Sequence, residues 1–139
     1  MTPTAIFWPM LAHVLLVYIV YLVLAVRRRA SVRSGEARAA QFKLRGAEPE
    51  SSITVSSNLM NQFELPVLFH VLCLALFATG GVSIVTLALA WIFIASRYVH
   101  AWVHLTSNRL RSRSPLFQFG ALVLGIAWVW FALHLAGAV

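Results

Sequence analysis

The sequence contains few charged residues and a single cysteine. Only 11% of its 139 residues are Asp, Glu, Lys or Arg, while 60% are hydrophobic and the mean hydropathy is +0.82. Soluble domains carry about 25% charged residues, so a soluble core is implausible and the composition predicts a polytopic membrane protein. Cys73 is the only cysteine, which excludes an intramolecular disulfide and leaves the redox compartment open.

Several familiar sequence signals are also missing. The chain has no GxGxxG, P-loop or GxSxG pattern, no internal repeat and no low-complexity segment. Its first apolar stretch is long, lacks a leading basic region and is followed by arginines instead of a small-residue cleavage site. We therefore expect a retained membrane helix and not a signal peptide. Arg outnumbers Lys ten to one, which weakly favours a GC-rich, bacterial source.

Four apolar stretches are long enough to cross a bilayer, which requires about 20 residues each. They cover about residues 6–26, 63–79, 82–105 and 116–135. Gly80 and Gly81 make a short uncharged turn, so the helices on either side are expected to be antiparallel neighbours. The sequence thus predicts one all-α domain over residues 1–139, a four-helix transmembrane bundle in up-down-up-down order.

The net charge of +7 is concentrated in the first and third connections between these spans. The basic residues are Arg27, Arg28, Arg29, Arg33, Arg38, Lys43 and Arg45 in the first, and Arg109, Arg111 and Arg113 in the third. The positive-inside rule places both connections, including a loop over about 34–51, in the cytoplasm and both termini outside. Basic runs can bind nucleic acid, but apolar flanks favour topology signals and anionic lipid head groups, so the expected partner is the lipid bilayer.

The third span continues into a polar segment, WIFIASRYVHAWVHLTSNRLRSR, over residues 91–113. At about 100° per residue, five of its side chains fall within about 80° of each other on a helix: Arg97, His100, His104, Asn108 and Arg111. Ionisable groups at membrane depth are costly and usually mark a functional site. The alternative is a solvated helix end whose long side chains snorkel.

The second span carries a matching polar stripe. Ser51 or Ser52 can cap a helix that starts near Ile53, and one face of it bears Ser57, Asn58, Asn61 and Glu64. Pro66 is tolerable in a membrane helix. Glu64 is the only acid outside the first loop, so we expect it to form a buried ion pair with Arg97 across the hairpin. The alternative is a pair that only sets helix register.

The remaining histidines and the last helix complete the expectations. His70 lies on the opposite face from Asn61 and His13 is treated as a packed bundle residue, so neither joins the site. Ser114 is expected to cap the fourth helix with Pro115 at its first position. Gly120 and Gly125 are small residues that allow close helix approach.

Metal and cofactor sites have weaker support. His100 and His104 stand at i, i+4, but Ala101 follows where a metalloprotease needs Glu, and no third ligand is evident. No metal site is therefore expected. Haem would need axial ligands on facing helices, and only His13 or His70 could supply a partner.

Two motifs together resemble a known family. The pattern N-x-x-E-x-P contains Asn61, Glu64 and Pro66, and R-x-x-H-x-x-x-H contains Arg97, His100 and His104 with an arginine after it. This combination resembles the MAPEG superfamily, the membrane-associated proteins in eicosanoid and glutathione metabolism, and in particular its small bacterial members. That group includes microsomal glutathione S-transferases, leukotriene C4 synthase and the microsomal prostaglandin E synthase.

The resemblance implies a homotrimer of four-helix subunits that binds glutathione between neighbours near the cytoplasmic face. It assigns glutathione contacts to Asn61, Glu64, Arg97, His100 and His104. Arg113 would stabilise the glutathione thiolate with Ser114 beside it, and an arginine among Arg27 to Arg29 also matches some members. His104 stands where many members have Tyr, and Phe117 where the prostaglandin synthase has Tyr. Both differences leave the second substrate open.

Three functions follow as hypotheses. The first is a glutathione-dependent membrane transferase or peroxidase acting on lipophilic electrophiles, with glutathione as co-substrate. The second is a catalytically inactive family member that serves as a membrane scaffold. The third is a small four-helix exporter, although such exporters carry their membrane Glu in the first helix, and here Glu64 follows a long basic loop. Enzymatic activity itself stays open at this point.

Overall fold

The computed structural model describes residues 2–43 and 49–139, so Arg45 and Gly46 of the basic loop lie outside the described residues. All regular secondary structure in the described chain is helical. Its elements are η1 (Pro3–Ile6), α1 (Phe7–Arg33), η2 (Ala39–Lys43), α2 (Glu50–Asn61), α3 (Leu65–Ala78), α4 (Ile84–Thr106) and α5 (Leu110–Leu135). The expectation of an all-α chain is confirmed.

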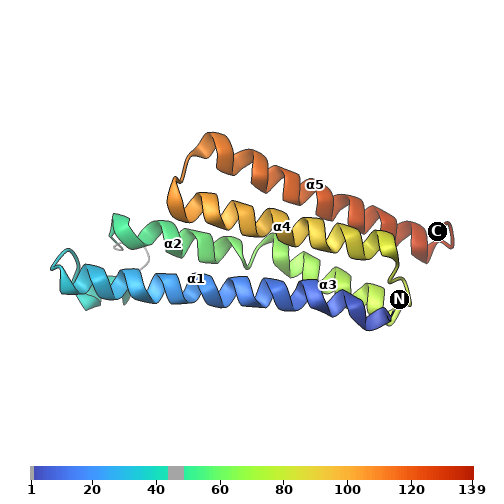
Figure 1. Cartoon of the computed structure of the whole chain (residues 1–139), viewed down its shortest axis with the longest axis horizontal. Helices are drawn as coiled ribbons and strands as arrows, with labels where there is room; N and C mark the ends of the chain where they lie inside the picture. The colour runs from blue at the N-terminus through green and yellow to red at the C-terminus, as the bar shows by residue number, and fades with distance from the viewer. Residues whose placement is uncertain (1, 44–48) are drawn as a thin grey trace.

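The helices form an up-down-up-down bundle. Helix α1 runs the length of the molecule, α2 and α3 lie end to end beside it, and α4 and α5 complete the bundle (Figure 1). Both termini and the Gly80–Gly81 turn lie at one end, opposite the α4–α5 turn (Figure 1). Four helical stretches are long and apolar enough to cross a membrane: Pro3–Arg33, Ser51–Ala78, Ile84–Thr106 and Arg111–Leu135. The predicted four-span membrane bundle is confirmed.

The apolar core lies mainly toward the end that holds the termini. Phe69 of α3 stacks on Phe93 of α4 with ring centroids 4.9 Å apart, and side chains from η1 and α5 close around them. A smaller cluster joins α1, α2 and α4 around Val20, Val55 and Ala101. Since lipid tails are as apolar as these side chains, close packing and not water exclusion holds such a bundle together.

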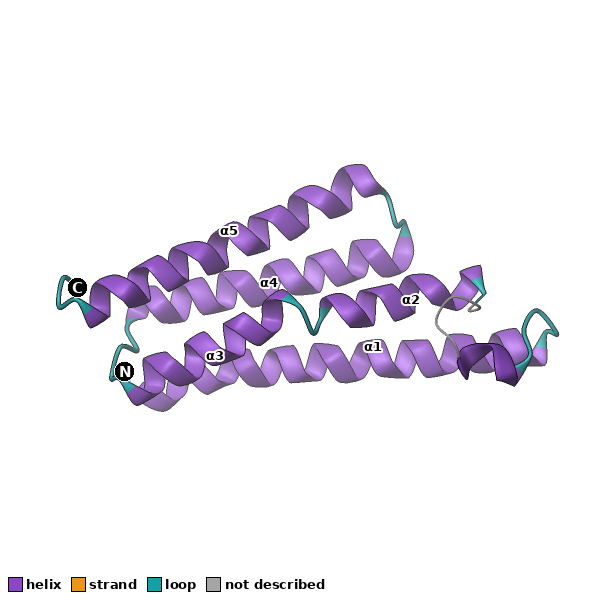
Figure 2. Cartoon of the chain, turned by 180° about the vertical axis from the view of Figure 1, so that it is seen from behind, coloured by secondary structure: helices purple, strands orange, loops and turns teal. Residues whose placement is uncertain are grey.

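The second span is interrupted, which corrects the expectation of one continuous helix. Helix α2 ends at Asn61 and α3 starts at Leu65 (Figure 2). Pro66 lies in the first turn of α3; in a continuous helix it could not donate to the carbonyl four residues back, and its ring would clash with that carbonyl. The carbonyl in question belongs to Gln62, the first residue after α2. Helix α2 also starts earlier than expected, after Pro49, without a serine cap.

The α4–α5 turn also differs from the prediction. Helix α4 ends at Thr106, and Asn108 adopts a left-handed backbone with φ 47°. Asn tolerates this conformation, and its N–H donates to the Val103 carbonyl at 2.9 Å, which caps the helix end. Arg111 therefore belongs to α5, and the polar stripe predicted on one helix is split between two.

Helix α5 begins at Leu110, not at Ser114 and Pro115 as predicted. Arg109 is its N-cap residue, and Pro115 lies inside the helix. Pro115 is the sixth residue of α5 and lies beyond the first turn, whose N–H groups have no helical partner, so it removes one helical hydrogen bond. Here the missing N–H leaves only the Arg111 carbonyl without its usual donor. Ser114 is therefore a helical residue on the exposed side of α5.

Gly120 and Gly125 make a matched pair for testing the α4–α5 contact. A Cβ on Gly120 would lie 2.9 Å from Ser96 Oγ, whereas one on Gly125 would meet nothing within 4 Å. We expect Gly120→Ala to destabilise the bundle by about 1–3 kcal/mol through overpacking. Gly125→Ala should be neutral or stabilise it by about 0.5–1 kcal/mol, because Ala favours a helix. Thermal unfolding in detergent measures both; equal effects would show that α5 does not approach α4 closely at Gly120.

Candidate functional site

Three basic side chains of α4 are completely buried in the bundle. Arg97, His100 and His104 are 0%, 1% and 2% exposed. Their spacing of three and four residues places them on one helix face, as the sequence predicted. Arginine is rarely this buried unless it is paired, so the surroundings of Arg97 decide what this cluster can do.

Helix α5 covers this cluster with an aromatic ring. The Arg97 Cζ lies 5.5 Å from the Phe117 ring centroid, and the His100 and Phe117 centroids are 5.8 Å apart. A cation over an aromatic face gains about 0.5–2 kcal/mol, the larger value when it is desolvated. The family resemblance identified Phe117 only as a residue that stands where the prostaglandin synthase has Tyr. In the structure it holds the buried guanidinium in place.

Arg113 reaches the same cluster from the first turn of α5. Its Nη1 donates to His104 Nε2 at 2.8 Å and to Asn108 Oδ1 at 2.8 Å. Because arginine only donates, His104 Nε2 accepts and the ring carries its proton on Nδ1. Asn108 is thus a positioning residue that the prediction assigned only to the polar stripe. Ser114 is adjacent but exposed, and within the described chain its side chain makes no hydrogen bond.

On its other side Arg97 contacts the break between α2 and α3. Its Nη2 donates to the Asn61 carbonyl at 3.3 Å. Asn61 is the last residue of α2, so its carbonyl points out of a helix end that does not continue. The half-buried Asn61 therefore joins the site through its backbone.

The predicted ion pair between Glu64 and Arg97 is not formed. Arg97 Nη2 donates to Asn61, and its Nε and Nη1 have no partner. Glu64 is exposed and only near enough for a Coulombic attraction. The reason is the helix break: Glu64, with φ −97° and ψ −102°, leaves the helical path and is turned away from the face that it would share with Asn61 on a continuous helix.

Unpaired polar atoms gather in this cluster. Five buried side-chain nitrogens of the described residues have no hydrogen-bond partner, and four belong to it: Arg97 Nε and Nη1, His100 Nδ1 and His104 Nδ1. Buried polar atoms are nearly always paired, and an unpaired buried charge is particularly costly. The arrangement has the chemistry of an anion site: donors are unpaired, and among the described residues no carboxylate is hydrogen-bonded to them.

A second buried polar network was missed by the sequence analysis. His70 Nε2 and His13 Nδ1 are 3.0 Å apart, His13 Nε2 is 3.3 Å from Gln62 Oε1, and Gln62 Nε2 donates to Asn58 Oδ1 at 3.1 Å. The helical wheel compared His70 only with Asn61, which lies on the opposite face, and did not consider Gln62. The available signal was Gln62 itself, a polar residue four positions before a proline in a membrane span.

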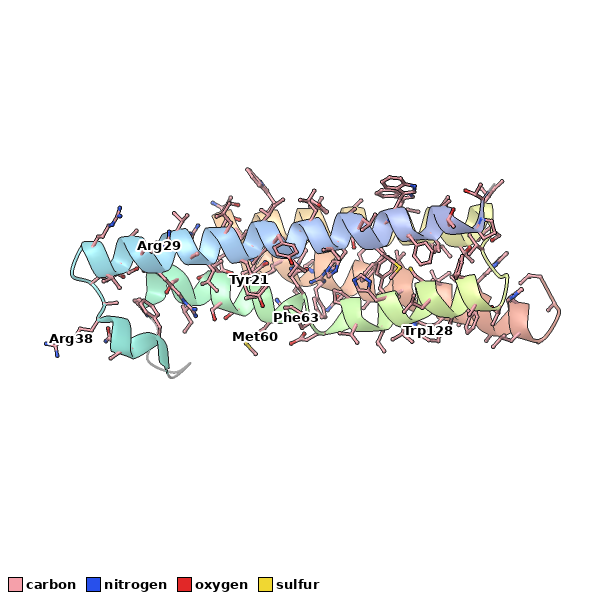
Figure 3. The ribbon with its side chains drawn as sticks, turned by 90° about the horizontal axis from the view of Figure 1, so that it is seen from below. Tyr21, Arg29, Arg38, Met60, Phe63 and Trp128 are labelled. Carbon is pink, nitrogen blue, oxygen red and sulfur yellow. The ribbon has the colours of Figure 1, made fainter. Side chains whose placement is uncertain are left out.

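The arginines at the end of α1 have different surroundings. Arg27 donates to the Leu105 carbonyl at 3.0 Å and to the Ser51 carbonyl at 3.4 Å, which ties α1 to α4 and α2. Arg28 lies 5.3 Å from the Phe42 centroid and lines a cleft of about 460 Å³ with Tyr21, Leu24, Ala25, Phe42, Ser56, Leu59, Met60 and Phe63. Figure 3 shows Tyr21, Met60 and Phe63 on this face.

The cleft and the buried cluster are separate, because no residue of the Arg97 cluster lines that cleft. Of the three candidate arginines, Arg28 faces the cleft and Arg27 is used within the bundle. In the part of the chain that the structure describes, no three His, Cys, Asp or Glu side chains gather as metal ligands would.

Comparison with known proteins gives one match. The chain matches the sequence model of the MAPEG family over residues 5–133, nearly its whole length. No curated protein and no solved structure matches it significantly. The matched range includes the two central membrane spans, all but the outer ends of the first and last, and every residue of the buried cluster.

Proposed function

The chain belongs to the MAPEG family, whose members are generally glutathione-related membrane enzymes, and from this premise we propose that it is a glutathione-dependent transferase or peroxidase acting on lipophilic electrophiles. The proposal names glutathione as co-substrate and the bilayer as the source of the second substrate. It also assigns roles to individual residues of the buried cluster.

One observation carries the proposal: Arg97 is a fully buried cation with two unpaired donor atoms and no ion pair. Such a group is expensive unless an anion completes it. Glutathione offers two carboxylates, and a guanidinium binds a carboxylate through two parallel hydrogen bonds. Nε and Nη1 lie on different edges of the Arg97 guanidinium, and each is adjacent to Nη2. The Nη2 N–H that does not bind Asn61 therefore forms a pair of adjacent donors with either Nε or Nη1.

The remaining roles follow from chemistry and position. Arg113 is the cation for the glutathione thiolate, because a neighbouring positive charge favours the ionised thiol. His104 and Asn108 hold its Nη1, which leaves its other nitrogens for the ligand. We also assign Ser114, the next residue of α5, to a position beside the thiolate. Glu64 is exposed at the helix break, where it can accept from the glutathione ammonium.

Asn61, His100 and His104 complete the proposed set of glutathione contacts. His100 Nδ1 and His104 Nδ1 are both buried without a partner. Since His104 accepts from Arg113, its Nδ1 carries a proton and can donate to the ligand. This gives His104 a polar function at a position where many family members have a tyrosine hydroxyl.

We further propose that the site is shared between copies in a homotrimer. No residue of the Arg97 cluster lines the cleft beside Arg28, and the exposed apolar residues of this cleft include Met60 and Phe63. A neighbouring copy would cover this face and bring Arg28 toward glutathione held on that copy. A lipophilic second substrate would then enter laterally from the bilayer.

Titration of the purified protein with glutathione by calorimetry tests the proposal. We expect saturable binding, followed by turnover with a chloronitrobenzene-type electrophile or an organic hydroperoxide. A parent protein that binds no glutathione would refute the glutathione-binding function. Binding without turnover of either electrophile class would favour a scaffold over an enzyme.

Membrane orientation supplies a separate prediction. The positive-inside rule places the connection after α1 in the cytoplasm and both termini outside; in a bacterium the membrane would be the inner one. In a Cys73→Ala background, an impermeant thiol reagent on intact cells should label Ala138→Cys and leave Ser34→Cys unlabelled until lysis. Both positions are exposed, so the reverse pattern would invert the orientation and not merely reflect burial.

A further inference from the structure

The break between α2 and α3 lies inside the bundle, where free backbone groups are costly. Gln62, the first residue after α2, is 2% exposed, and its side chain bonds to residues of α1 and α2. Its amide nitrogen donates to Asn58 of α2, its oxygen faces His13 of α1, and His13 in turn faces His70 of α3. The polar chain therefore connects every segment that meets at the break.

The hydrogen-bond directions in this chain are determined by Gln62. Because its Nε2 donates to Asn58, its Oε1 must accept from His13 Nε2. A neutral imidazole has one donor and one acceptor nitrogen, so His13 Nδ1 accepts from His70 Nε2. Donation runs in one direction, from His70 through His13 and Gln62 to Asn58. The Gln62 amide also donates to the Asn58 carbonyl at 3.4 Å, one of the backbone groups near the end of α2.

The same break supplies the carbonyl that holds Arg97. Asn61 precedes Gln62 directly, and its oxygen accepts from Arg97 Nη2 at 3.3 Å. This contact orients the guanidinium and leaves Nε and Nη1 unpaired. If the break moved, the carbonyl would move with it, and Arg97 would lose its orientation without any change in its own helix.

We propose that Gln62, His13 and His70 are positioning residues for the anion site: their buried hydrogen-bond chain holds the α2–α3 break and thereby aims Arg97 at its ligand. Identification of that ligand as glutathione rests on the proposed function. This hydrogen-bond chain contacts neither glutathione nor the reacting atoms. Its effect is transmitted through one backbone carbonyl, and it should therefore influence binding more than reactivity.

Three variants test the assignment. Gln62→Leu removes the centre of the chain and His70→Phe removes its end, while His70→Gln keeps a donor for His13 and is the conservative control. We expect Gln62→Leu to raise the glutathione Kd by at least about tenfold, the size expected for roughly one charge-assisted hydrogen bond. The ultraviolet thiolate absorbance per bound glutathione should not change. His70→Gln should resemble the parent protein, and His70→Phe should resemble Gln62→Leu.

Two further measurements need no glutathione and separate this inference from the proposed function. Amide hydrogen exchange around residues 60–67 should be at least about tenfold faster in Gln62→Leu, because the hydrogen-bond chain suppresses local opening of the backbone at the α2–α3 break. Melting temperatures should also be non-additive in a double-mutant cycle of Gln62→Leu with Arg97→Met. Unchanged exchange, or additive melting shifts, would overturn the inference even if glutathione binds. Faster exchange with an unchanged Kd would show that the chain only supports the fold.

Discussion

Replacing Arg113 by Ala is expected to remove most of the activity while leaving much of the glutathione affinity. In the proposed site the Arg113 guanidinium faces the thiolate, which is the nucleophile. A shift of the bound thiol pKa from about 7 back toward about 8.5 corresponds to roughly 2 kcal/mol. Loss of one preorganised donor to a developing charge typically lowers kcat by about 10²–10³.

Two measurements check this expectation. The ultraviolet thiolate absorbance of bound glutathione at neutral pH should fall in Arg113→Ala, and the pH–rate profile should move to higher pH. Arg111→Ala is the matched control, since it removes the same charge from an exposed position two residues away on the same helix. If the thiolate absorbance fell equally in both variants, the effect would come from the loss of one positive charge and not from the position of Arg113. An unchanged thiolate absorbance in Arg113→Ala would show that Arg113 does not stabilise the thiolate.

Replacing Arg97 by Met is expected to have the opposite pattern. Loss of a buried charge that pairs with a ligand carboxylate costs about 2–5 kcal/mol, so the glutathione Kd should rise by at least about 30-fold. Carboxylate contacts are present in the ground state and the transition state alike, so kcat at saturating glutathione should change far less. Glu64→Gln should weaken binding more mildly, because Glu64 is exposed.

The stability of the ligand-free Arg97→Met variant makes the test stricter. Replacement of a buried ionic group by an apolar one of similar size is often neutral or stabilising by about 1–4 kcal/mol. Since Arg97 has no ion pair, its melting temperature in detergent should not fall. A clear fall with unchanged glutathione affinity would mean that Arg97 serves the fold. If the melting-temperature changes of Arg97→Met and Glu64→Gln were strongly non-additive, they would indicate an ion pair between Arg97 and Glu64 that the structure does not show.

Together these two variants separate binding from reactivity. Arg97 and Arg113 lie in one cluster, but each contacts different protein groups. Asn61 and Phe117 hold the first, and His104 and Asn108 hold the second. The proposed site therefore divides into a part that selects the anion and a part that activates the thiol.

Much of this protein is determined by its sequence alone. A bilayer core demands about 20 apolar residues per crossing, and four such stretches in a chain of 139 residues permit few arrangements. The polar face of α4 was equally visible, because Arg97, His100 and His104 follow the helical period. The family motif around them is local in sequence, so it required no knowledge of packing.

The tertiary structure alone decided the contacts of these residues. Helical periodicity predicts neighbours only within one helix. Near Pro66 and at Asn108 the polar pattern continues in the sequence, but the helix ends. The first interruption turns Glu64 outward, and the second transfers Arg111 to another helix. Whether Arg97 would meet a carboxylate, a carbonyl or a phenyl ring depended on the direction of the chain after those breaks. That direction results from packing between distant helices, which no local pattern in the sequence records.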